Sequence, residues 1–143
     1  MGERLLVPYD GSEPAEDALE YAFEKFPDAD VVALYVVPVP EGYWAAFQNP
    51  EDRIPAVDAA RDNGRDILDE AVDLAADRGR DLETEIATGK PDHEIVDLAA
   101  AEGYDTIVIG SHGREGVSRI MLGSVAENVV RRSPVPVVVV RQQ

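Results

Sequence analysis

Glycines recur at positions 110, 113, 116 and 123 after the fourth apolar run of the chain, in the segment GSHGREGVSRIMLGSVAENVV. Gly110 and Gly113 carry no Cβ, so the backbone can turn sharply there and a ligand can approach its N–H groups. Gly123 and Ser124 come directly before a stretch expected to form the last helix, whose first N–H groups lack intrahelical partners and attract anions. The spacing predicts that the two glycine pairs form opposite walls of one phosphate pocket.

The charge distribution points to the same segment. Residues 110–143 hold five Arg against two Glu, a net of +3, whereas the whole chain carries −16. His112 and Arg114 are near enough in sequence to reach a bound anion. Arg131 and Arg132 come at the end of the expected helix, where we expect them to interact with its dipole or with solvent. The other histidine, His93, is expected on the surface of a helix.

Two candidate site residues, Ser124 and Asp10, also have purely structural interpretations. The run from Ser124 to Glu127 matches a capping box, in which Ser124 would simply cap its own helix. Asp10, in the segment PYDGSE, could serve only as a turn former. Neither the phosphate-loop pattern GxxxxGK[ST] nor the dinucleotide pattern GxGxxG is present. The residues alone therefore leave phosphate binding and local structure both open.

Apolar runs alternate with amphipathic stretches along all 143 residues. We expect strands over 5–7, 30–37, 82–88, 106–109 and 135–141, and helices over 15–26, 57–75, 91–103 and 124–132. This alternation predicts one α/β domain over residues 1–143, with a five-stranded, mostly parallel sheet and helices on both faces. Charge alternates with apolar residues in 82–88, which favours an edge strand. In such a sheet the ligand lies at the carboxyl ends of the strands, where the strand order reverses.

Composition excludes several classes of function. The absence of cysteine excludes a disulfide scaffold, a Cys-ligated zinc site, an iron–sulfur cluster and a thiol nucleophile. No histidine and carboxylate spacing supports a metal site. With 29 acidic against 13 basic residues, we expect no binding to nucleic acid or to a membrane surface. Without a leader or a long apolar run, we expect a cytoplasmic protein.

The charged residues are also unusual in type: the chain has 29 Asp and Glu residues and 11 Arg, but only 2 Lys. A carboxylate-rich, lysine-poor surface is typical of proteins from halophilic organisms, and an ordinary acidic protein is the alternative.

The pattern G-x2-G-x9-G-[ST], met by Gly110, Gly113, Gly123 and Ser124, occurs together with PYDGSE near the start and PVPVVVV near the end. In this combination the chain resembles the universal stress protein family over its whole length, and in particular the members that bind ATP. The resemblance implies a Rossmann-like fold similar to that of the adenine nucleotide alpha hydrolases, with strand order 3-2-1-4-5.

The resemblance also implies where ATP, with Mg²⁺, would bind. The carboxylate of Asp10, beside Pro8, would face the adenosine, and the backbone of Val36 would read the adenine edge. The ribose and phosphates would be lined by the glycine loop and the start of the last helix, that is, by Gly110, His112, Gly113, Arg114, Gly123, Ser124 and Val125.

The resemblance further implies a homodimer that acts as a nucleotide-dependent regulator of the stress response. Its last strands, which begin at Val135 and end at Val140, would pair antiparallel and so cover an exposed valine-rich edge. Glu115 is the one carboxylate in the loop between the glycine pairs, and its neighbours give no reason to direct it toward a ligand. We therefore expect at most slow ATP hydrolysis and assign no catalytic residue. Two alternatives are a slow ATPase or adenylate hydrolase, and a nucleotide-free dimeric interaction module. The second would use Tyr43, Trp44 and Phe47 in the long segment 38–55.

Overall fold

A computed structural model describes residues 3–38, 55–111 and 123–141, and the nine elements in it follow the predicted order. They are β1 (Arg4–Pro8), α1 (Glu13–Lys25), β2 (Asp30–Pro38), α2 (Pro55–Asp77), β3 (Glu83–Gly89), α3 (Pro91–Ala101), β4 (Thr106–Gly110), α4 (Ser124–Arg132) and β5 (Val137–Val140).

Among the strands, the last differs most from the prediction, since it begins at residue 137 and not at residue 135. The amide of Val135 donates instead to the Ser133 hydroxyl (3.1 Å), in a local turn after α4. Pro136 has no N–H to give to a strand ladder. These two residues therefore lead into β5 without extending it.

The five strands form one parallel sheet in the order β3-β2-β1-β4-β5, which confirms the predicted order. The chain moves outward from β1 through β2 to β3, then crosses back to β4 on the other side of β1. The order thus reverses between β1 and β4. The carboxyl ends of these two strands are the place where a fold of this class holds its ligands.

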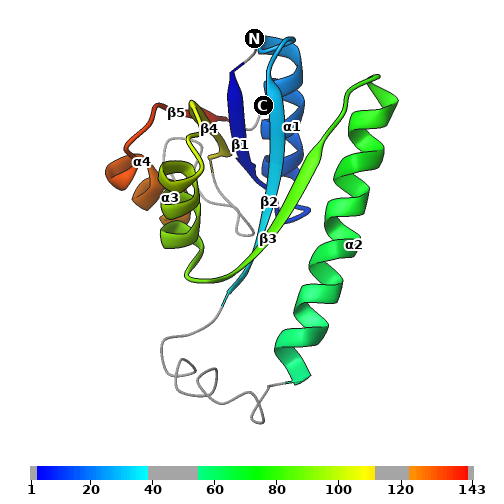
Figure 1. Ribbon diagram of the computed structural model, residues 1–143, viewed down its shortest axis with the longest axis vertical. Helices are drawn as coiled ribbons and strands as arrows, with labels where there is room; N and C mark the ends of the chain where they lie inside the picture. Colours follow the sequence, from blue (N-terminus) through cyan, green and yellow to red (C-terminus); the bar gives the residue numbers. More distant parts are fainter. Residues whose placement is uncertain (1–2, 39–54, 112–122, 142–143) are drawn as a thin grey trace.

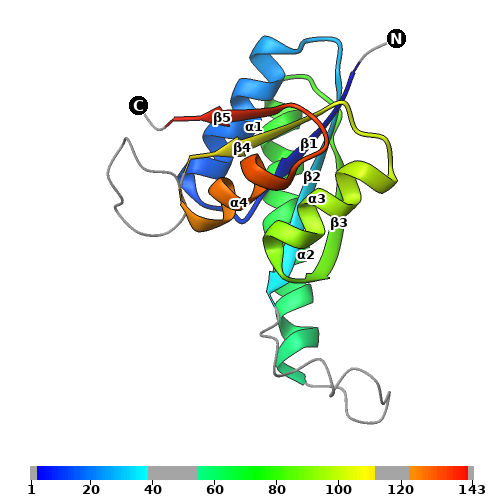
Figure 2. The same ribbon diagram turned by 90° about the vertical axis from the view of Figure 1, so that its left-hand side faces the viewer.

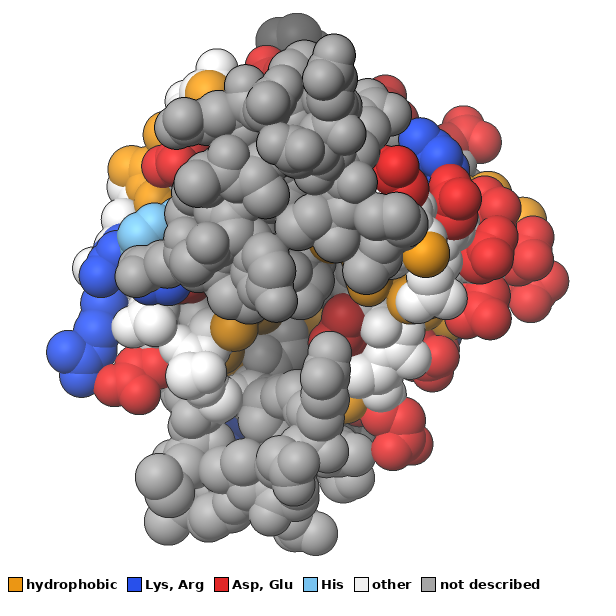
Figure 3. Space-filling view, turned by 90° about the horizontal axis from the view of Figure 1, so that it is seen from below, with side chains coloured by type: hydrophobic (Ala, Val, Ile, Leu, Met, Phe, Trp, Pro, Cys, Tyr) orange, Lys and Arg blue, Asp and Glu red, His pale blue; other side chains and the backbone are white. Residues whose placement is uncertain are grey.

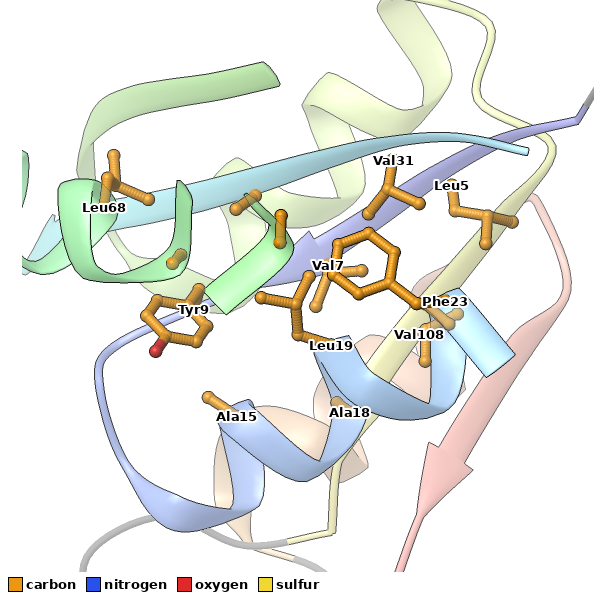
Figure 4. Packing of buried hydrophobic residues seen from close by; sticks show 14 residues of the cluster. Leu5, Val7, Tyr9, Ala15, Ala18, Leu19, Phe23, Val31, Leu68 and Val108 are labelled. Carbon is orange, nitrogen blue, oxygen red and sulfur yellow. The ribbon is translucent and has the colours of Figure 1, made fainter. Parts of the chain in front are cut away.

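Helices cover both faces of the sheet, with α1 and α2 on one face and α3 and α4 on the other (Figures 1 and 2). Side chains of β1 alternate between the two faces: Leu5 and Val7 join the core under α1 and α2, and Leu6 joins the core under α3 and α4. Figure 4 shows Phe23 and Leu19 of α1 lying close to Val7 in the first of these cores. Strands buried on both faces are typical of parallel sheets.

The two edges of the sheet differ in charge. Glu83 and Glu85 of β3 are exposed, as the charge alternation predicted, and charged residues discourage further strand pairing. The other edge, β5, consists of four half-buried valines. Within the described part of the chain, no helix is both long and apolar enough to cross a membrane.

Candidate functional site

Ser111 joins three elements at the carboxyl end of β4. Its amide donates to the carbonyl oxygen of Val140 in β5 (2.9 Å), and its own carbonyl oxygen accepts a hydrogen bond from the amide of Gly123 (2.7 Å). Residues 110 and 123, which belong to the two predicted glycine pairs, are therefore held near each other by the backbone. The two ends of this loop therefore lie together.

The first turn of α4 begins directly after this contact. Gly123 is the N-cap residue, with extended backbone angles (φ −65°, ψ 160°), and no side chain caps the helix. Ser124 is the first helical residue, so the capping-box interpretation of Ser124 is wrong. The amides of Ser124, Val125 and Ala126 consequently have no acceptor within the helix, whose positive dipole end they mark. Such a helix start can bind an anion.

Gly110 proves to be required for packing. A Cβ at this position would lie 2.6 Å from the carbonyl oxygen of Pro14 and 2.8 Å from the Pro14 Cβ. Gly110 does not have a positive φ, since that conformation is found only at other glycines of the described chain. Gly110 is the last residue of β4 and does not need the conformational freedom of glycine there. Its missing side chain lets the start of α1 approach the end of β4.

Asp10 follows β1 at the same edge of the sheet and is exposed. Its Oδ1 atom accepts hydrogen bonds from the amide (3.0 Å) and the hydroxyl (2.5 Å) of Ser12. The Ser12 hydroxyl in turn caps α1 by accepting from the Ala15 amide (3.4 Å). Asp10 thus forms the local turn that its sequence suggested, and this turn fixes the carboxylate at the end of β1.

Val36 presents its backbone at the end of β2. The amide of Tyr9 donates to the carbonyl oxygen of Leu34 (2.8 Å), so the peptide groups of Leu34 face β1. Peptide groups of alternate strand residues face the same neighbour, and those of Val36 therefore face the same side. The register of β1 with β2 ends at Pro8↔Leu34, two residues before Val36. The Val36 N–H and C=O are thus directed past the end of β1, level with Asp10.

Tyr9, directly after β1, is buried in the hydrophobic core next to this edge of the sheet. Its side chain is 2% exposed and lies between Leu68 of α2 and Leu19 of α1 (Figure 4). Burial first, and then the nearby carboxylates with Glu16 first among them, together raise the pKa of Tyr9 to about 12. The Tyr9 hydroxyl therefore stays protonated at neutral pH.

Charge is divided across the face that carries these strand ends (Figure 3). Asp and Glu side chains gather on the side of α1 and α2, and basic side chains lie beside His93 on the side of α3 and α4. Arg131 pairs with Glu127 (2.7 Å) and Arg132 contacts His93 (2.7 Å), both near the end of α4. These arginines are helix-end and surface charges, as predicted, and His93 is on the surface, as expected.

Not every predicted site residue can be placed. Pro8, Asp10, Val36, Gly110, Gly123, Ser124 and Val125 lie at the carboxyl edge of the sheet. His112, Gly113 and Arg114, together with Glu115, Tyr43, Trp44 and Phe47, lie outside the described residues. No group of three His, Asp or Glu side chains suited to a metal ion occurs within residues 3–38, 55–111 and 123–141.

Ser111 lies at the candidate site, and the sequence did not single it out. It is only 6% exposed, although it is polar, and its backbone bonds both Gly123, which joins the ends of the loop, and Val140 of β5. Its position in the sequence could have indicated this role, because a small polar residue directly after a buried strand lies at the ligand-binding edge of a parallel sheet.

Proteins of known family share this architecture at full length. The sequence matches the Universal stress protein family over residues 1–141. Universal stress protein YxiE of Bacillus subtilis is 34% identical, over 99% of this chain and 100% of its own. Universal stress protein MJ0577 of Methanocaldococcus jannaschii is 32% identical, over 100% of this chain and 97% of its own.

Solved structures agree with these relationships. The structure of MJ0577 has a TM-score of 0.82 at 31% identity and covers 100% of this chain and 98% of its own. A universal stress protein in complex with cAMP has a TM-score of 0.73 at 25% identity, with 99% of both chains covered. The match in sequence spans all nine elements of the fold, and the match in structure includes the strand ends and the start of α4. The chain therefore belongs to the universal stress protein family.

Proposed function

We propose that this chain is an ATP-binding regulatory protein, with the nucleotide at the carboxyl ends of β1, β2 and β4. The observation that carries the proposal is the uncapped first turn of α4, which the 2.7 Å bond from the Gly123 amide to the Ser111 carbonyl holds beside the end of β4. Three amides without helical acceptors at a positive dipole end suit a phosphate group. Gly123 adds no side chain that would obstruct it.

The adenosine would lie on the β1 and β2 side of the same edge. There the N–H and C=O of Val36 offer a donor and an acceptor from one residue, which suits the edge of an adenine base. Asp10 stands beside this position with its Oδ1 atom held by Ser12, so its carboxylate is oriented before a ligand arrives. Pro8 forms the adjoining wall without an N–H of its own to satisfy.

We assign the middle of the phosphate site to His112, Gly113 and Arg114. Their support is the spacing G-x2-G-x9-G-[ST] and the fact that both ends of this loop lie together. A relative solved in complex with cAMP, at 25% identity and a TM-score of 0.73, supports an adenine nucleotide as the ligand class.

Mg²⁺ would enter with the nucleotide. The described residues offer no cluster of three ligands for an ion, but the Ser124 hydroxyl is exposed at the first position of α4. This hydroxyl and the phosphate oxygens are the hard oxygen ligands that Mg²⁺ prefers. When bound, the ion would neutralise phosphate charge.

We expect hydrolysis to be slow at most. A nucleotide hydrolase needs a group that orients the attacking water. Of the described carboxylates near the site, Asp10 is engaged in the turn before α1, and Glu127 is paired with Arg131 at 2.7 Å. Neither is placed to activate water at the start of α4. The protein would therefore act through its nucleotide-bound state, as a switch in the stress response.

We also propose a homodimer that forms through β5. The peptide groups of Val138 and Val140 face β4, since Val140 accepts from Ser111, and those of Val137 and Val139 therefore face outward. An open row of N–H and C=O groups on a valine strand is a template for pairing. The opposite edge, with Glu83 and Glu85, lacks this character.

Native mass spectrometry of freshly purified protein tests both parts of the proposal. We expect a dimer that retains nucleotide, with ATP identified after extraction in denaturant. A nucleotide-free protein whose melting temperature does not change with Mg-ATP would refute the nucleotide part. A monomer that binds ATP would refute only the dimer.

A further inference from the structure

One ring nitrogen of His93 lies near two groups of opposite charge, at a contact between α3 and α4. Nη1 of Arg132, the last residue of α4, is 2.7 Å from Nε2 of His93, in the first turn of α3. Oδ2 of Asp92 is 3.9 Å from the same Nε2. A single atom thus has both a cationic donor and a carboxylate within 4 Å.

The short contact defines the protonation state of the ring. A guanidinium can only donate hydrogen bonds, so Nε2 must accept from Arg132. His93 is therefore neutral in this arrangement, with its proton on Nδ1. If the ring gained a second proton, Nε2 would become a donor and could no longer accept from Arg132. Two cations would then face each other at hydrogen-bond distance.

We propose that His93 is a pH-operated latch between α3 and α4. The neutral ring holds Arg132, and the protonated ring releases Arg132 and turns its Nε2–H toward Asp92. Histidine is the side chain that ordinarily changes charge between about pH 5 and 8. The latch goes beyond nucleotide binding and requires no ligand, although it holds the far end of the helix whose first turn is the proposed phosphate wall.

The charged neighbours of His93 explain why the ring would change partner. The Asp92 side chain is 10% exposed, so its carboxylate is poorly solvated and gains from a nearby cation. On the same helix, Glu94 is close enough that His93 lowers its pKa, against the larger effects of burial and of Asp97. From α4, the charged group in contact with the ring is Arg132. Protonation thus removes one partner and strengthens the attraction of the carboxylates.

An NMR titration of the ligand-free protein from pH 8 to pH 5 tests the latch. The ring signals of His93 are those that disappear in His93→Gln. We expect the backbone amides of Arg132 and Ser133 to shift with the same midpoint as this ring, and we expect their titration to disappear in His93→Gln.

Two variants separate the latch from a general effect of pH. Removing the cation in Arg132→Gln should move the His93 midpoint to higher pH, and removing the carboxylate in Asp92→Asn should move it to lower pH, because a nearby cation disfavours and a nearby anion favours the protonated ring. The exposed pair Arg65 and Asp62 on α2 supplies a control, since Arg65→Gln should leave the midpoint unchanged. The latch is refuted if the α4 amides do not follow the ring, or if the midpoint is the same in Arg132→Gln as in the wild type.

Discussion

The amide of Gly123 donates a hydrogen bond to the carbonyl oxygen of Ser111 at 2.7 Å, across a separation of twelve positions in the sequence. Because the Ser111 amide also donates to Val140, the end of β4 fixes both the start of α4 and the end of β5. The proposed phosphate wall and the proposed dimer strand are thus attached to one residue. Variants in α4 and in β5 should therefore separate nucleotide binding from dimer formation.

Gly110→Ala should destabilise the fold. The new Cβ would lie 2.6 Å from the carbonyl oxygen of Pro14, which is backbone and cannot rotate away. Overpacking of this kind costs about 1–3 kcal/mol of unfolding free energy, measurable by urea denaturation. If Gly110→Ala has wild-type stability but does not bind ATP, Gly110 is a ligand contact and our packing assignment is wrong.

Val139→Pro should dissociate the dimer and leave the subunit folded. The Val139 amide faces outward, so proline removes a donor from the free edge without breaking the ladder with β4. Val138→Pro is the matched variant, because the Val138 amide faces β4 and its loss should destabilise the subunit itself. Sedimentation velocity and circular dichroism together distinguish the two. A folded dimer in Val139→Pro would place the interface elsewhere.

Arg80→Ala should lower stability by about 2 kcal/mol, because hydrogen bonds from a charged group contribute about 1.5–3 kcal/mol. The Arg80 guanidinium donates to the carbonyl oxygens of Phe23 (2.9 Å) and Ala29 (3.1 Å) and lies over the Phe23 ring, 4.9 Å from its centroid. It therefore satisfies backbone groups at the end of α1. Arg65→Ala, which removes an exposed pair with Asp62, should change stability by less than about 0.5 kcal/mol. Equal effects of the two variants in chemical denaturation would contradict this role.

Tyr9→Phe should protect the fold at high pH. The folded protein holds the pKa of Tyr9 at about 12, above its ordinary value of 10.0. A group whose pKa is raised by folding contributes stability that is complete below its unfolded pKa and is lost as the pH rises through its folded pKa. The wild type should thus lose stability between about pH 10 and 12, and Tyr9→Phe should lose less. Melting temperatures over this range measure the difference, and absorbance at alkaline pH should show fewer late-titrating tyrosines in Tyr9→Phe than in the wild type, in which burial also raises the pKa of Tyr104. Identical alkaline profiles would contradict the burial argument.

The sequence predicted the elements well where burial on both faces produced an apolar run, as in Leu5 to Val7 of β1. The helix predicted over 91–103 begins at Pro91, as α3 does, whereas α3 ends at Ala101, two residues before Gly103, which has a φ of +67°. The strand order followed from the family resemblance and is confirmed by the sheet. What these features share is that they depend on neighbours in the sequence or on a pattern common to the family.

Features that depend on distant residues could not be predicted. Gly110 is required by Pro14, which comes 96 positions earlier, and nothing in the glycine loop itself reveals that contact. The Ser124 to Glu127 run fits a capping box, yet the tether of Gly123 to Ser111 makes Gly123 the N-cap residue. His93 reads as a surface histidine, and its contact with Arg132 appears only when α3 and α4 pack.

Isothermal titration calorimetry of Mg-ATP into Gly123→Val tests the central claim most directly. Position 123 has ordinary extended angles, so valine adds bulk at the start of α4 without backbone strain. Lys90→Val is the matched control, since Lys90 is the N-cap residue of another helix, α3, and also has extended angles. We predict wild-type affinity in Lys90→Val and loss of at least tenfold, about 1.4 kcal/mol, in Gly123→Val. Equal affinity of the two variants would contradict a phosphate site at the start of α4.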